Sequence, residues 1–112
     1  MRRLPLFVVV AIAGWLLAVT EVCAEEPAFT LTIRNHQFDP SQLEVPAGAK
    51  VRLTLRNLDP TAEEFDSDDL HREKVVAGNS EGVVFIGPLR PGTYNFMGEY
   101  HQATAQGRIV AK

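Results

Sequence analysis

Short runs in which apolar and polar residues alternate are the feature that most constrains the fold of this chain. The alternation is clearest over residues 51–55, where arginine and threonine separate Val51, Leu53 and Leu55. Further strand-like runs lie at 29–33, 43–45, 83–86, 94–96 and 107–112. A period of two indicates a strand with one buried face, and turns rich in proline and glycine separate the runs. The pattern predicts an all-β sandwich or barrel, with space for one helical turn at residues 66–74.

The first 24 residues are typical of a secretory signal peptide rather than of the folded domain. Two arginines precede an almost wholly apolar run over residues 4–19. Val22 and Ala24 then place small residues at the two positions that a signal peptidase recognises. The run is shorter than the roughly 20 apolar residues of a membrane anchor. An acidic residue two positions before the cysteine argues against a lipoprotein. We expect cleavage after Ala24, which leaves residues 25–112 as one exported domain that is not embedded in a membrane.

Removal of the signal peptide leaves an acidic domain without cysteine. The full chain has a net charge of −3, and the first 24 residues hold two basic residues and one acidic residue, so the mature charge is −4. Because contacts to phosphate dominate nucleic-acid binding, an acidic domain of this size is a poor candidate for it. The single cysteine, Cys23, leaves with the signal, so we expect no disulfide.

Three pieces of the sequence, taken in order, carry a family resemblance. They are Phe38-Asp39-Pro40 with the segment 43–51, Asn57 at the end of a strand, and the segment 87–96 followed by His101 and Gly107. Together they resemble the cupredoxin-like domain family over nearly all of the mature chain. The resemblance implies a small Greek-key β-sandwich, in agreement with the all-β pattern.

The resemblance also implies which residues stand at the metal end of the sandwich. A blue-copper site holds its metal with a His, a Cys and a second His, and with a weak axial Met. The register of Tyr94-Asn95-Phe96 places Gly98 at the cysteine position and His101 at the second histidine position. The methionine position falls near Ala105 or Gln106. Because glycine has no side chain, we expect no type 1 copper.

The first histidine position of the family falls on an acidic pair. The sequence leaves open whether Glu63 or Glu64 occupies it, although alternation with Phe65 favours Glu63 pointing inward. Carboxylate and imidazole together suit iron(II), copper(II), manganese or zinc better than copper(I). We therefore expect one metal ion, iron or copper. Its candidate ligands are His101, Glu63, Glu64, Glu99 and Met97.

One branch of the family fits the sequence better than the blue-copper proteins. The segments 64–67, 72–76 and 98–101 resemble small periplasmic cupredoxin-like proteins associated with bacterial iron uptake across the inner membrane. This resemblance implies a periplasmic metal-binding accessory protein of a ferrous-iron uptake system. Its expected partner is an inner-membrane iron permease or another periplasmic transport component.

The alternative hypothesis is a binding module without metal. Five carboxylates fall within residues 63–69, and such a run is typical of a solvated loop or of a surface that docks a basic partner. We expect His36 and His71 to be exposed surface residues. No pair of nucleophile and base is visible. Iron oxidation coupled to uptake would need an electron acceptor, and the sequence supplies none.

Overall fold

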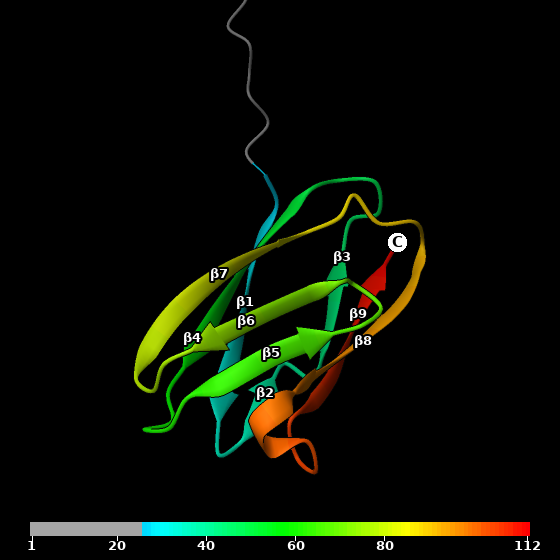
Figure 1. The fold of residues 1–112 in the computed structure, drawn as a ribbon. Helices are drawn as coiled ribbons and strands as arrows, with labels where there is room; N and C mark the ends of the chain where they lie inside the picture. The colour runs from blue at the N-terminus through cyan, green and yellow to red at the C-terminus, as the bar shows by residue number, and fades with distance from the viewer. Residues whose placement is uncertain (1–25) are drawn as a thin grey trace, which may run out of the picture.

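The chain folds into two β-sheets of mixed strand direction (Figure 1). The structure, a computed structural model, describes residues 26–112, so the expected signal peptide lies outside the described residues. The four-stranded sheet has the order β2-β1-β4-β7 and the five-stranded sheet the order β3-β9-β8-β5-β6. The all-β sandwich expected from the sequence is confirmed. Within residues 26–112 no helix has the length and apolar character needed to cross a bilayer.

The bounds of the elements are as follows. The first sheet contains β1 (Ala28–Arg34), β2 (Gln37–Asp39), β4 (Val51–Asn57) and β7 (Ser80–Ile86). The second contains β3 (Gln42–Val45), β5 (Glu63–Ser67), β6 (Arg72–Val76), β8 (Gly92–Gly98) and β9 (Gln106–Ala111). A short 3₁₀-helix, η1 (Glu99–His101), follows β8. The β1–β4 and β3–β9 pairs are parallel, and the other pairs are antiparallel.

The core lies between the two sheets and follows from the alternation in the strands. Every second residue of β4 is buried, and the inward side chains of β1 and β9 meet those of β4. Phe38, Phe65 and Phe96 pack together at one end of this core, with ring centroids 4.9–6.2 Å apart. Because Phe65 and Phe96 belong to β5 and β8, these contacts fix the strands that lead into the candidate site.

The prediction for residues 66–74 was wrong. These residues form no helical turn but belong to the β5–β6 hairpin, whose turn is closed by the His71 amide donating to the Asp68 carbonyl at 3.2 Å. Glu63, Phe65 and Ser67 are all buried, so β5 does alternate. Two of its three inward residues, Glu63 and Ser67, are polar, so an apolar–polar alternation is not visible in the sequence of β5. The helical turn of the fold is instead η1, within a segment expected to be loop.

A buried asparagine organises the loop between β4 and β5. The Asn57 side chain is 1% exposed, and its amide donates to the carbonyl of Thr61 at 2.9 Å and to those of Val76 and Ala77 at 3.3 Å. Its side-chain oxygen accepts the backbone N–H of Asp59 at 3.0 Å. Asn57 thereby fixes the position of Asp59.

The Asp59 carboxylate stabilises the two-residue turn between β1 and β2. Its carboxylate accepts the backbone N–H of Asn35 at 2.8 Å and that of His36 at 2.9 Å. Both turn residues have positive φ, 52° and 56°. Burial pushes the pKa of Asp59 up, but these two hydrogen bonds and the neighbouring imidazoles of His36 and His101 outweigh it, so the pKa lies below its ordinary value.

Asp59→Ala should lower the free energy of unfolding at pH 7 by about 1–3 kcal/mol, because two turn amides lose their acceptor. A carboxylate with a lowered pKa in the folded state stabilises the protein above its unfolded pKa of roughly 3.9, and this contribution disappears as pH falls through the folded value. The gap between wild type and variant in urea unfolding should therefore shrink between pH 7 and pH 3. Asp68→Ala, at an exposed site, is the control. An Asp59→Ala gap of equal size at both pH values contradicts the account.

Candidate metal centre

The candidate site is built around the buried carboxylate of Glu63 at the start of β5. The residue is 1% exposed, and its Oε2 atom lies 2.5 Å from Nδ1 of His101. Its Oε1 atom accepts the backbone N–H groups of Glu64 and Tyr100, each at 3.0 Å. A buried carboxylate is costly unless hydrogen bonds satisfy it, and here both oxygens have partners. Glu63 points inward, as its alternation with Phe65 predicted.

Gly98 makes room for this carboxylate. A Cβ atom at Gly98 would lie 2.6 Å from Cδ and 2.8 Å from Oε2 of Glu63, and 2.6 Å from Cβ of Ala105. Real Cβ atoms do not approach other atoms so closely, so any side chain at this position would displace its neighbours. The Glu63 carboxylate and the Ala105 methyl group therefore fill the space that a larger residue would need.

A second histidine lies against His101. The rings of His36 and His101 are stacked, with centroids 3.6 Å apart and planes inclined by 12°. Thr104 Oγ1, from the loop after η1, donates to the His36 carbonyl at 2.6 Å. His36 is half-buried, so the expectation that it is an exposed surface residue was wrong. This contact was not predictable from the sequence, because the β1–β2 turn brings the two histidines together.

The remaining candidate ligands lie on the outer face of the five-stranded sheet. Glu64 follows the inward Glu63 and so points to the opposite face of β5. Met97 is the cross-strand partner of Asp66, which places both on that outer face. Glu99 is exposed on η1 and lies near Asp66. Of the five residues named from the sequence, the structure brings Glu63 and His101 together and places Glu64, Glu99 and Met97 on the other side of β5.

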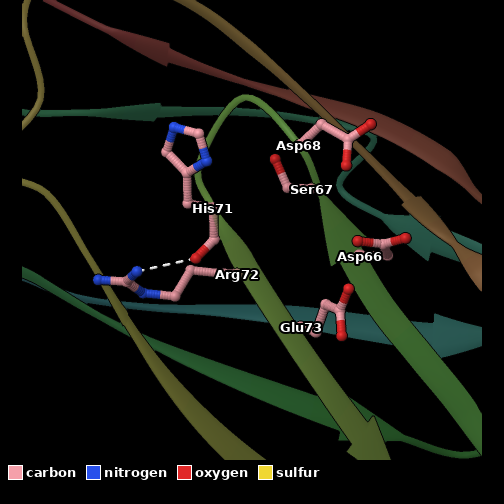
Figure 2. A pocket seen from close by; sticks show the side chains of 6 residues that line it. All are labelled: Asp66, Ser67, Asp68, His71, Arg72 and Glu73. Carbon is pink, nitrogen blue, oxygen red and sulfur yellow. Dashed lines mark hydrogen bonds between the residues drawn. The ribbon is translucent and has the colours of Figure 1, made fainter.

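We refer to Glu64, Asp66, Glu73 and Glu99 as the acidic face. The hydrogen bond with Asp66 raises the pKa of Glu99 above its ordinary value, and partial desolvation and the charges of Asp66 and Glu64 act in the same direction. Figure 2 shows Asp66 and Glu73 facing each other across β5 and β6 at the edge of an open hollow. The carboxylates of Asp66 and Glu64 are therefore close enough to Glu99 to disfavour its charge.

The third histidine of the chain, His71, lies apart from this site. It is exposed in the β5–β6 turn, at the other end of β5 from Glu63. The Arg72 side chain donates to the His71 carbonyl at 2.9 Å, an interaction drawn in Figure 2. At about 3.3 Å per residue, the length of β5 separates the turn from Glu63 by roughly 13 Å. The expectation of a surface residue is confirmed for His71, and it is the natural control histidine.

Comparison with known proteins assigns the family. The Cupredoxin-like domain family matches residues 6–111. The chain belongs to the cupredoxin-like domain family. The uncharacterized protein RP394 of Rickettsia prowazekii (strain Madrid E) is 48% identical over 80 residues, which are 71% of this chain and 64% of that protein. The chain thus spans less than two thirds of that relative's length.

Solved structures show the same cupredoxin fold. Auracyanin A, a "blue" copper protein of Chloroflexus aurantiacus, matches with a TM-score of 0.68 at 16% identity over 76% of this chain and 98% of that chain. The metal-binding domain of the Cu(I)-exporting P-type ATPase CopA of Streptococcus pneumoniae D39 matches with a TM-score of 0.64 at 15% identity, over 76% and 84%. At this identity the likeness establishes the fold and not the metal.

Type 1 copper does not fit the side chains of this cupredoxin-like domain. A thiolate supplies the soft donor of such a site, and the one cysteine, Cys23, precedes the described residues. The carboxylate of Glu63 fills the space in front of Gly98. Among residues 26–112, no group of three or more His, Cys, Asp or Glu side chains is arranged to hold a metal ion. Any metal bound here would meet imidazole and carboxylate donors, with open positions left for other ligands.

Gly98→Ala should destabilise the fold by about 1–3 kcal/mol, the usual cost of overpacking a core. Gly92→Ala is the matched control, because a Cβ atom there would have its nearest neighbour at an ordinary 3.8 Å. Urea unfolding measures both, and combining Gly98→Ala with Glu63→Ala should cost less than the sum of the two single changes. Equal stabilities of Gly98→Ala and Gly92→Ala would show that the carboxylate does not occupy this space.

Proposed function

We propose that this chain is a periplasmic metal-binding accessory protein of a ferrous-iron uptake system. The single observation that carries the proposal is the buried Glu63 carboxylate in contact with Nδ1 of His101. Histidines that bind metals commonly use one ring nitrogen for the metal and donate the other N–H to a carboxylate, which fixes the orientation of the ring. The His101 side chain is 25% exposed, so an ion from solution can reach it.

The donor chemistry favours borderline divalent ions over copper(I). Imidazole suits iron, copper(II) and zinc, whereas copper(I) prefers thiolate and thioether ligands. The one thioether near the site, Met97, lies on the outer face of the sheet. A site of this kind suits a protein that receives and releases an ion more than one that holds a redox centre permanently.

The location and partner are parts of the same proposal. A signal peptide over residues 1–24 would export the domain, and the resemblance of segments 64–67 and 98–101 to iron-uptake proteins supports a permease or another transport component as partner. The acidic face would raise the local concentration of cations near η1 through its negative potential.

A second candidate function is docking without metal. Asp66 and Glu64 raise the pKa of Glu99, and a basic surface on a partner protein would relieve this repulsion. In this function the Glu63–His101 pair would be a structural element of the sandwich.

Titration calorimetry with iron(II) under anaerobic conditions, copper(II) and zinc(II) separates the two functions. We expect wild-type residues 25–112 to bind one ion, and His101→Ala to abolish the binding. Glu63→Gln should weaken it by about 10–100-fold, the usual effect of losing a carboxylate behind a metal-binding histidine. Glu64→Ala, on the outer face, is the matched control and should leave the affinity unchanged. If Glu64→Ala weakens binding as much as His101→Ala, the ion sits on the acidic face and the proposed centre is wrong.

A further inference from the structure

The backbone at His36 is strained and held from two sides. With φ at 56°, His36 adopts the left-handed conformation in the β1–β2 turn, where glycine is the preferred residue. For residues with a Cβ atom this conformation is unfavourable. The His36 N–H donates to Oδ2 of Asp59 at 2.9 Å, and its carbonyl accepts from Thr104 Oγ1 at 2.6 Å. A histidine at this position therefore costs stability, and the loops on both sides hold it against His101.

The Glu63 carboxylate determines which nitrogen of His101 is available. An ionised carboxylate only accepts hydrogen bonds, so Nδ1 of His101 must carry the hydrogen that faces Oε2. The lone pair of the neutral ring then lies on Nε2, away from the buried Glu63. Both Glu63 oxygens already have hydrogen-bond partners, so this carboxylate needs no metal to be satisfied.

We propose that His36 and Nε2 of His101 form a two-imidazole site for a borderline divalent transition-metal ion, with Glu63 as a positioning residue behind His101. This inference rests on the proposed function and assigns the ligands within it. It adds His36, which was expected from the sequence to be an exposed surface residue, and it changes the role of Glu63 from ligand to support.

The two rings lie close enough for one ion to reach both. Their centroids are 3.6 Å apart and their planes are inclined by 12°, whereas a tetrahedral ion holds two nitrogens roughly 3.4 Å apart with both lone pairs directed at it. The rings are nearly parallel, so capture of an ion requires them to tilt about their side-chain torsions.

The charges around the two rings also favour a cation. Glu63 contacts the ring of His101, and Asp59 accepts the backbone N–H of His36, so a buried carboxylate lies near each histidine. No third His, Cys, Asp or Glu side chain within residues 26–112 completes the site. Water or a group from a transport partner must fill the remaining positions, and such an open site exchanges its ion readily.

Copper(II) is the probe used to determine how many nitrogen ligands the site provides. We expect the electron paramagnetic resonance spectrum of the wild-type domain with one equivalent of copper(II) to show coupling to two imidazole nitrogens. His36→Gly should leave one coupling and weaken calorimetric zinc(II) binding by at least about tenfold. Because glycine suits the positive φ, the urea midpoint of this variant should stay the same or rise, which separates a lost ligand from a lost fold. His71→Ala is the control and should change neither measurement.

Glu63→Gln distinguishes a positioning residue from a ligand. We expect it to weaken zinc(II) binding while both nitrogen couplings to copper(II) remain. If His36→Gly behaves as His71→Ala does while the wild type still binds metal, the assignment of His36 is overturned and the proposed function stands. If the wild type itself binds none of the ions, the proposed function fails and the two-imidazole site with it.

Discussion

The rest of the candidate site depends on the burial of a single carboxylate, that of Glu63. Moving a charge out of water costs several kcal/mol unless the protein supplies replacement partners. Here one oxygen accepts two backbone N–H groups and the other meets His101, so β5 and η1 are tied together at one point. The glycine at position 98 belongs to the same arrangement, because any larger residue would collide with the carboxylate. Gly98 stands where a blue-copper protein has its cysteine, and its lack of a side chain leaves the space for the Glu63 carboxylate that orients His101.

A second polar network supports the site from the first sheet. Asn57 is buried at the end of β4 and binds the backbone on both sides of the β5–β6 hairpin, and it also positions Asp59. Asp59 holds the β1–β2 turn, and this turn carries His36 to the ring of His101. The two imidazoles thus meet because Glu63, in β5, holds the ring of His101 and Asp59, in the β4–β5 loop, holds the backbone of His36. Loss of either anchor should act on the site through its geometry.

The sequence predicted those parts of the fold in which apolar residues alternate, and it failed where polar residues face inward. Strand β4 was clear because its inward side chains are aliphatic, whereas β5 buries Glu63 and Ser67 and was mistaken for a loop with a helical turn. The inward direction of Glu63 was predictable because Phe65 sets the alternation of the strand. The contact between His36 and His101 was not, because it depends on a turn held by a hydrogen bond to Asp59, 23 residues away in the chain. Local pattern carries no information about such a contact.

The exchange of donors at this end of the sandwich changes what the fold can do with a metal. A copper ion bound by a soft thiolate within a closed site suits electron transfer, because the ion stays in place while its oxidation state changes. Here the Glu63 carboxylate occupies the interior, and the nitrogen donor of His101 that is left faces outward beside His36. A site with open positions at the surface loses its ion easily, and the same openness lets another protein contribute ligands. The sandwich is common to both arrangements, so they differ in where the donors stand, in the interior of the fold in a blue-copper site and at its rim in the proposed site.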